Sequence, residues 1–341
     1  MSAEKGSRSP YLLLCVTMLL WGSAFSSSKT VVEEMPHTVA ALLRFGGGAV
    51  ALLAAVAVSA CRTARTPGTQ GSRGGSLAVT MRSRHGNFLR TAWRAGLAGV
   101  LGVFAYNGFL FWGLSLAPSL DAGALVPVLS PVLTSLFLLL TGAEQASRTR
   151  LAGLALGLAG AAVFLVGASG TTHGSPARPA GDALFVLSAG CWAAYTLVGP
   201  RVLAGLDPLR ATTYATCMGA VLLGVLAAPD LAQVHWSTLP TGLWLNVLYL
   251  AVGAAAVANL FYYRAVGTVG PASASLMMFT VPVVNTVCAT VFLGESFAPV
   301  QGLGAAGLLA GAVLAVRSRG RADRTAMRSP LAHVMRTERK S

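Results

Sequence analysis

The sequence predicts an all-helical integral membrane protein with ten transmembrane helices, arranged as two inverted repeats of five. Three observations support this fold class. Hydrophobic residues make up 54% of the 341 positions and charged residues only 11%, against about 25% charged residues in a typical soluble domain. Charged residues are sparse in ten apolar stretches, each long enough to cross about 30 Å of hydrocarbon as a helix. Landmarks of the first half also recur at a fixed spacing in the second half.

The ten stretches follow one another through mostly short polar connections. We expect helices near residues 11–32, 38–60, 93–116, 121–141, 150–168, 181–199, 209–229, 241–264, 270–293 and 298–316. The basic loop 61–92 and the tail contain too few apolar residues to fold alone, so both are expected to be disordered. The predicted units are an amino-terminal segment (1–10), a first five-helix repeat (11–168), a second repeat (181–316) and the tail (317–341).

The first stretch imitates a secretory signal peptide, because Lys5 and Arg8 precede an apolar run and small residues follow it. We interpret it as a retained helix, since apolar residues continue through Val32 and the stretch has a counterpart later in the chain.

Basic residues gather on one side of the predicted topology. With a cytoplasmic amino terminus, 22 of the 25 Lys and Arg residues lie on the cytoplasmic side or at the helix ends that face it. The exceptions are Lys29, Arg44 and Arg178. Topology and attraction to anionic lipid of the inner leaflet therefore explain the net charge of +14, and no nucleic-acid partner is expected. Both termini are predicted to be cytoplasmic in a protein of the cell membrane.

The internal repeat has an offset of 151 residues. The matched landmarks are Pro131 with Pro282, Glu144 with Glu295, Gly153 with Gly304 and Gly160 with Gly311. Because five is odd, the second copy must enter the membrane from the opposite side. Inverted repeats are typical of transporters, since two similar halves can close either side of a central cavity at similar energy. A duplication without transport is the alternative.

Short motifs spread over both halves point to a family. They are WGSAF at 21–25 with Lys29, LLRF at 42–45, LAPSLDAGALVPVLSPV at 116–132 with GAE at 142–144, LAGLALGLAG at 151–160, AVGTVGPASASLMMFTVPV at 265–283 and LGE at 293–295. Over about residues 11–316 this set resembles the EamA family of the drug/metabolite transporter superfamily. The resemblance implies ten helices, a central cavity and movement of small metabolites, amino acids among them. GAE in place of Gly-Glu and the extra Pro127 depart from the family pattern.

Prolines inside two of the predicted helices mark candidate breaks. Pro127, Pro131 and Pro282 each free the carbonyl four residues earlier. Lipid cannot satisfy these carbonyls, so the helix faces that bear them are predicted to line protein or a watery cavity and to act in gating. A packed kink without ligand contact is the alternative.

Two corresponding helices carry an amide one turn before aromatic rings. The residues are Asn107 with Phe111 and Trp112 in the third predicted helix, and Asn259 with Tyr262 and Tyr263 in the eighth. Such a face suits a small amphipathic solute, because rings supply apolar contact and amides fix orientation. In the competing interpretation, the aromatic residues form an interfacial belt and the amides bridge helices.

Four further residues are candidates for substrate contact. Trp21 and Trp192 hold matching positions in the first and sixth predicted helices, where packing is an equally good explanation. Asn285 either contacts substrate or joins helices, because an amide in hydrocarbon needs a partner. Arg44 either attracts a substrate carboxylate or holds helix ends together, whereas Lys29 is interpreted as structural.

Within and beside the predicted helices, carboxylates occur only near the helix ends. Glu144 and Glu295 are predicted structural anchors, each complementing the positive end of the helix that follows it. No Asp or Glu lies in the middle third of any predicted helix. The sequence therefore shows no obvious proton-relay carboxylate and no counter-ion for a cationic drug, which favours a neutral, zwitterionic or anionic metabolite.

Motifs for cofactors and catalysis are missing from the sequence. The five Cys residues form no CxxC pair, and the five His residues lack the spacing of a metal site. There is no P-loop, GxSxG or HExxH motif. These absences indicate neither ATP hydrolysis nor catalysis within the membrane, so no enzymatic activity is expected. The predicted function is secondary transport of a small metabolite, such as an amino acid, by alternating access and in the direction of export. A broad-range drug efflux carrier and a non-transporting receptor or assembly protein are the alternatives.

Overall fold

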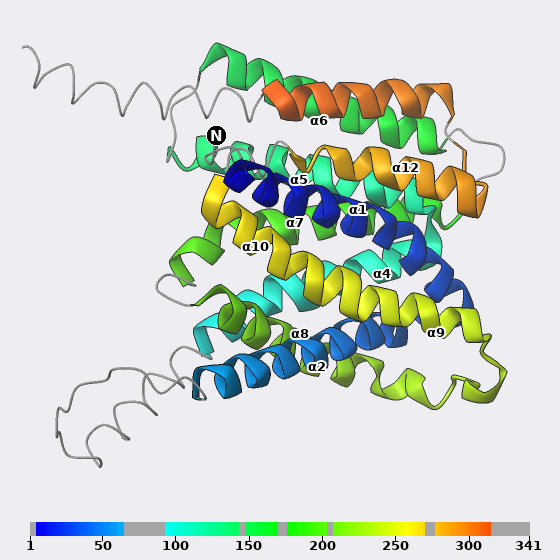
Figure 1. Ribbon diagram of the computed structural model, residues 1–341. Coiled ribbons are helices and arrows are strands. Elements are labelled where there is room, and N and C mark those ends of the chain that lie inside the picture. The colour runs from blue at the N-terminus through cyan, green and yellow to red at the C-terminus, as the bar shows by residue number, and fades with distance from the viewer. Residues whose placement is uncertain are drawn as a thin grey trace, which may run out of the picture.

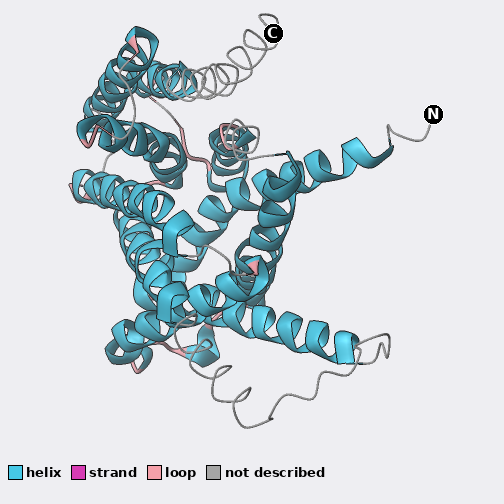
Figure 2. Cartoon of the chain, turned by 90° about the vertical axis from the view of Figure 1, so that its left-hand side faces the viewer, coloured by secondary structure: helices cyan, strands magenta, loops and turns pink. Residues whose placement is uncertain are grey.

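The computed structural model describes residues 5–64, 93–142, 147–169, 176–202, 207–269, 277–296 and 298–314. Within these ranges every regular element is a helix, and none is a strand (Figures 1 and 2). The predicted all-helical fold is confirmed. Of the loop predicted at 61–92, residues 61–64 extend a helix, and the rest lies outside the described residues together with the tail.

The helices follow the predicted apolar stretches closely. In chain order they are α1 (Lys5–Glu34), α2 (His37–Ala64), a span Trp93–Leu116 that contains η1 (Val100–Ala105) and α4 (Tyr106–Leu116), α5 (Ser119–Leu140), α6 (Arg148–Ser169), α7 (Arg178–Val202), α8 (Pro208–Leu231), η2 (Trp236–Thr238), α9 (Thr241–Leu248), η3 (Tyr249–Val257), α10 (Ala258–Val269), α12 (Thr280–Leu293) and a C-terminal helix (Pro299–Leu314). Eight spans among the described residues are long and apolar enough to cross a membrane, while α12 and the C-terminal helix are apolar but shorter.

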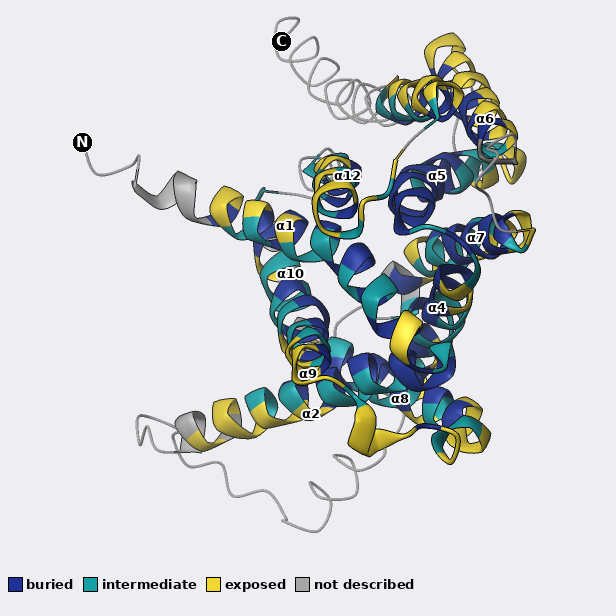
Figure 3. Cartoon of the chain, turned by 90° about the vertical axis from the view of Figure 1, so that its right-hand side faces the viewer, coloured by how far each residue is buried: buried dark blue, intermediate teal, exposed yellow. Residues whose placement is uncertain are grey.

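Helices from the two halves of the sequence pack against each other. α1 packs mainly on α10 and α12, α7 packs on α4 and α5, and α2 packs on α8 (Figure 1). Buried residues lie on the faces that meet inside the bundle, and exposed apolar residues such as Val166 and Val225 lie on the outer faces (Figure 3). An apolar outer surface of this kind fits contact with lipid rather than water.

The C-terminal helix lies beside α6 because glycines remove the side chains between them. A Cβ atom added to Gly304 would lie 2.6 Å from the Cα of Phe164 and 2.9 Å from the carbonyl oxygen of Gly160. A Cβ atom added to Gly311 would overlap the backbone of Gly157 in the same way. The two backbones therefore touch, as in the small-residue interfaces of membrane helices.

Two wide-turned π-helical segments interrupt the helices on either side of the bundle centre. η1 belongs to the first half and η3 to the second, and η1 shifted by 151 residues falls within η3. η1 packs on α8, and η3 packs on α2. π-helical turns are rare and frequently occur at functional sites.

A central cavity between the two halves

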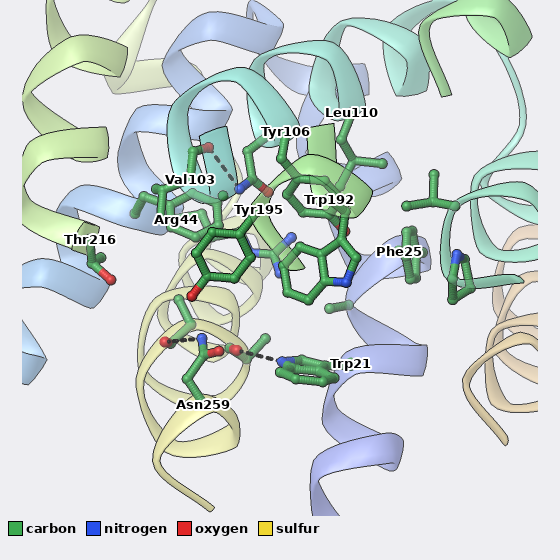
Figure 4. A pocket seen from close by; sticks show the side chains of 18 of the residues that line it. Trp21, Phe25, Arg44, Val103, Tyr106, Leu110, Trp192, Tyr195, Thr216 and Asn259 are labelled. Atoms are coloured by element: carbon green, nitrogen blue, oxygen red, sulfur yellow. Dashed lines mark hydrogen bonds between the residues drawn. The ribbon is translucent and has the colours of Figure 1, made fainter. Parts of the chain in front are cut away.

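A cavity of about 110 Å³ lies where helices of both halves meet (Figure 4). Its lining comes from α1, α2, η1, α4, α5, α7, α8, η3 and α10, with Val281 in the first turn of α12 and Met278 just before that helix. Trp192 and Tyr195 project toward it from α7, opposite Trp21 and Asn259 (Figure 4). The volume is below the roughly 300–1,000 Å³ of pockets for drug-sized ligands, so this conformation accommodates a small solute.

Aromatic rings form two matched pairs around the cavity. The ring of Trp192 lies 5.0 Å from that of Tyr106 and 5.5 Å from that of Tyr195. The ring of Trp21 lies 5.0 Å from that of Tyr262, and its indole N–H donates to the carbonyl of Ala254 in η3 at 3.3 Å. Each of the two tryptophans thus packs on a tyrosine from the other half of the sequence. Trp21 and Trp192 both line the cavity.

The two predicted amides are held in the same way. The Nδ2 of Asn107 donates to the carbonyl of Val103 in η1 at 2.9 Å, and the Nδ2 of Asn259 donates to that of Ala255 in η3 at 2.8 Å. Both residues line the cavity. Asn107 is 1% exposed, and its Oδ1 atom has no hydrogen-bond partner among the described residues. A buried amide oxygen without a donor is costly, so it favours a solute that brings an N–H group.

Arg44 reaches the cavity from α2 with its charge unneutralised. Its Nη1 donates to the hydroxyl of Ser28 at 3.2 Å, and its guanidinium carbon lies 5.1 Å and 5.8 Å from the ring centres of Phe45 and Phe111. Its Nε has no partner, and no carboxylate in the described ranges lies within ion-pair distance of it. A buried cation supported only by a hydroxyl and two ring faces is an incomplete anion site.

Three of the predicted aromatic contacts lie elsewhere. Phe111 is fully buried in the core behind Arg44, and Trp112 is 47% exposed and stacks on His37 at 5.9 Å. Tyr262 supports Trp21 and donates to the sulfur of Met278 at 3.8 Å rather than lining the cavity. The side chain of Tyr263 lies outside the described residues. Of the predicted face in the first half, Asn107 therefore lines the cavity in this structure, while Phe111 and Trp112 do not.

Asn285 joins helices and does not line the cavity. Its Oδ1 accepts from the hydroxyl of Ser26 at 3.1 Å, and its Nδ2 donates to the carbonyl of Ser119 at 2.9 Å. It is fully buried. Of its two interpretations, the geometry supports the one in which the amide ties α1, α5 and α12 together.

The three prolines differ in position. Pro127 lines the cavity, while Pro131 and Pro282 do not. The carbonyl of Met278, expected to be free because of Pro282, accepts from the N–H of Val281 at 3.0 Å. This expectation was wrong because a tight turn at the start of α12 supplies a local donor.

Glu295 caps a helix other than the expected one. Its carboxylate accepts from the N–H groups of Ser119 and Leu120 at 2.9 Å and 2.8 Å, and from the hydroxyl of Ser119 at 3.1 Å. These donors begin α5. The C-terminal helix, which follows Glu295 in sequence, is instead capped by Gln301, whose Oε1 accepts from the N–H of Ala298 at 3.0 Å. Glu144 lies outside the described residues.

Glu295→Gln is expected to lower the stability of the folded protein by about 1 kcal/mol, because the charge that complements the N-terminus of α5 is lost. The thermal unfolding midpoint of the purified protein in detergent measures this effect. Glu33→Gln is the control, since Glu33 is exposed and lies 3.7 Å from Lys29 in a surface ion pair, which contributes little. Equal thermal unfolding midpoints for the two variants would contradict the capping of α5 by Glu295.

Several lining residues escaped prediction from the sequence. They are Phe25, Tyr106, Ser130, Tyr195, Thr212 and Thr216. Tyr195 lies three residues after Trp192, so helical periodicity places both on one face, and this signal was available. The threonines of α8 carry no comparable signal, since nothing in the sequence places α8 beside the cavity.

Comparison with known proteins gives a consistent set of relatives. The EamA-like transporter family matches residues 8–166 and again residues 179–317. The uncharacterized transporter YyaM of Bacillus subtilis is 24% identical over 277 residues, which is 81% of this chain and 84% of that protein. The aromatic amino acid exporter YddG of Ancylobacter novellus is 28% identical over 263 residues, 76% of this chain and 80% of that protein.

Two further matches extend the comparison. A protein of Streptantibioticus cattleyicolor named "Probable terminal-alkyne amino-acid exporter" is 31% identical over 223 residues, 64% of this chain and 71% of that protein. A solved crystal structure with 23% sequence identity covers 90% of this chain and 95% of its own, with a TM-score of 0.54. This likeness shows a shared fold.

Proposed function

Because this chain belongs to the EamA-like transporter family, and so is a multi-pass membrane protein, we propose that it exports a small zwitterionic or anionic metabolite, such as an amino acid. The movement occurs by alternating access and without ATP. The observation that carries the proposal is the buried, unneutralised guanidinium of Arg44 at the central cavity.

The cavity offers one partner for each charge of an amino acid. The guanidinium of Arg44 donates to a carboxylate, preferably through two hydrogen bonds. The unpartnered Oδ1 of Asn107 accepts from an ammonium group. The rings of Trp21 and Trp192 supply apolar contact for a side chain. Two relatives are named as amino-acid exporters, which supports the same class of solute.

The proposed architecture is ten helices in two inverted five-helix repeats, 11–168 and 181–316. The family matches the chain twice, at residues 8–166 and 179–317. The matching π-helices η1 and η3 and the packing of each half on the other support the same arrangement. A pair of similar halves around one cavity provides the two states that alternating access requires. In this orientation the termini and the basic loop 61–92 face the cytoplasm and anionic lipid.

Flux in proteoliposomes tests the function directly. Purified protein is reconstituted, and counterflow of a radiolabelled amino acid is measured against unlabelled competitors. The expected result is saturable flux that amino acids and simple carboxylates inhibit, whereas the methyl esters and decarboxylated amines of the same amino acids do not. Inhibition by bulky organic cations would favour a drug efflux carrier. Saturable binding without flux would favour a receptor.

Asn107→Leu is expected to raise the half-saturation concentration of a zwitterionic amino acid about tenfold, because a hydrogen bond to an ammonium group contributes about 1.5 kcal/mol. A carboxylate that lacks the amino group should keep its half-saturation concentration. Counterflow with both solutes measures the difference.

Asn285→Leu is the matched control for that experiment, since Asn285 is an equally buried amide outside the cavity. It should lower the thermal unfolding midpoint and leave the half-saturation concentrations unchanged in the folded fraction. A shift for both solutes in Asn107→Leu, or for neither, would contradict the assignment of the Asn107 oxygen to the ammonium group.

A further inference from the structure

A second buried polar cluster lies outside the cavity, where α5, α7 and the C-terminal helix meet. It consists of Asp121, Arg178, Asp182 and Gln301, none of which is more than 9% exposed. In sequence the two aspartates stand 61 residues apart, each near the start of its helix. The fold brings them together, although neither occupies the middle of a span where a relay carboxylate is usually sought.

Asp121 has a full set of donors. Arg178 donates to it twice, from Nε to Oδ2 at 2.7 Å and from Nη2 to Oδ1 at 2.9 Å. Gln301 adds a third bond, from Nε2 to Oδ1 at 3.1 Å. The two-pronged geometry is that of a strong ion pair, so Asp121 is the ionised carboxylate of the cluster. The pair also explains why Arg178 departs from the distribution of the other basic residues.

Asp182 is the second carboxylate of the cluster, and Arg178 is bound to the other one, Asp121. Asp182 is 3% exposed, its carboxylate lies within hydrogen-bonding reach of that of Asp121, and its Oδ1 has no partner in the described part of the chain. Two facing carboxylates with one guanidinium would leave a net buried negative charge, which is costly. A proton bound to Asp182 removes that charge. The protonated carboxyl of Asp182 can then donate a hydrogen bond to the carboxylate of Asp121.

The described parts of the surrounding helices supply no free charge to balance the cluster. On α1, Lys29 donates to the carbonyl of Leu114 at 2.8 Å and lies 3.7 Å from Glu33. α4 has no charged residue, and the C-terminal helix has none over Pro299–Leu314. The charges of α6 are Arg148 and Arg150 at its first turn, where Arg150 donates to the carbonyl of Ser135, far along α5 from Asp121. Glu295 is occupied by the first turn of α5. Among the described residues, a bound proton is therefore the remaining way to neutralise Asp182.

We propose that Asp182 is the proton-binding site through which this protein couples movement of its solute to the proton gradient. The inference rests on the proposed transport function and adds the coupling ion and its site. The reaction is reversible protonation of one carboxylate, with no change in any other bond.

The cluster is placed to affect the cavity because it ties together two helices that line it. Pro127 and Ser130 of α5 and Trp192 and Tyr195 of α7 lie further along the helices that Asp121 and Arg178 join. With the proton bound, Asp182 can donate to Asp121, which stabilises the contact between α5 and α7 at this end of the bundle without preventing their separation. Without it, the two carboxylates repel and compete for Arg178, which favours separation of α5 and α7.

The test uses purified full-length protein in proteoliposomes, with potassium buffers free of sodium. A difference of one pH unit across the membrane should drive uphill accumulation of the labelled amino acid, up to about tenfold for one proton per solute. Asp182→Asn should retain solute exchange at equal pH and lose this accumulation. Asp207→Asn should behave as wild type, because Asp207 is exposed, caps α8 by accepting from the N–H of Arg210 at 3.1 Å, and Asn caps equally well.

Two measurements on the wild-type protein keep the test decisive if Asp182→Asn does not fold. Solute movement should change the pH inside weakly buffered vesicles, and the infrared spectrum should contain a protonated carboxyl band near neutral pH. The proposal is overturned by exchange that ignores the pH gradient, by solute movement without a pH change, by accumulation driven by sodium instead, or by unaltered accumulation in a folded Asp182→Asn. Absence of any solute flux in the wild type contradicts the transport function itself, whereas the infrared band still reports whether a carboxyl group of the protein is protonated.

Discussion

Arg44→Gln is expected to weaken binding of a carboxylate-bearing solute by about 10- to 100-fold without lowering the stability of the protein. A charge-assisted hydrogen bond contributes about 1.5–3 kcal/mol, and glutamine cannot supply the charge or the two-pronged geometry. Arg44 has no carboxylate partner among the described residues, so its removal breaks no ion pair there. The loss therefore falls on the solute-bound state alone.

Stability should move in the opposite direction from affinity. A buried cation without a counter-ion is costly to desolvate, so Arg44→Gln is expected to keep or raise the thermal unfolding midpoint of the solute-free protein. Arg150→Gln is a matched control, because Arg150 is a buried arginine that is 3% exposed and donates to the carbonyl of Ser135 at 3.1 Å, away from the cavity. That variant should keep affinity, because its guanidinium does not line the cavity.

Solute-induced thermal stabilisation and counterflow measure the two quantities on the same samples. If Arg44→Gln lowers the solute-free unfolding midpoint while the half-saturation concentration stays as in wild type, Arg44 is a structural residue. The cavity would then have no cationic group that binds the carboxylate of a solute.

Gly304→Leu is expected to destabilise the folded protein by about 3 kcal/mol or more and to reduce the yield of monodisperse protein sharply. A side chain at this position would enter the backbone of α6, since even a Cβ atom would lie 2.6 Å from the Cα of Phe164. Overpacking against side chains costs about 1–3 kcal/mol, and backbone is harder to displace.

The same helix offers a matched control two residues away. Gly302 has no described heavy atom within 4 Å of the position its Cβ would take. Gly302→Leu adds the same volume to the lipid-facing side and should express and unfold as wild type. Size-exclusion profiles and thermal unfolding midpoints measure both variants, and similar behaviour would mean that α6 and the C-terminal helix are not in backbone contact.

Apolar length and the repeat offset predicted most of the helical architecture. The described helices lie on the predicted apolar stretches, and the offset of 151 residues also relates η1 to η3. The reason is physical: in hydrocarbon, each backbone must satisfy its own hydrogen bonds, so length and polarity nearly determine a spanning helix. The wide turns of η1 and η3 have no such composition signal and were not predicted.

The candidate site was predicted unevenly. Trp21, Trp192, Asn107 and Asn259, which were chosen for their matching positions in the two halves of the sequence, all line the cavity. The hydrogen-bond partners of these side chains were harder to predict from the sequence than their positions along the helices. Helical periodicity does not reveal that Glu295 reaches the start of α5, since that contact joins residues 176 positions apart.

The packing of each half upon the other has a consequence for biosynthesis. The hydroxyl of Thr17 in α1 reaches the carbonyl of Ala258, a residue made 241 positions later. At translation rates of about 5–20 residues per second, α1 resides in the bilayer for roughly 10–50 s before this partner emerges from the ribosome. Until then, the polar groups of the early helices must be satisfied by the insertion machinery or by transient contacts with other helices. A nascent chain that stalls midway would lack the helices on which its first half packs.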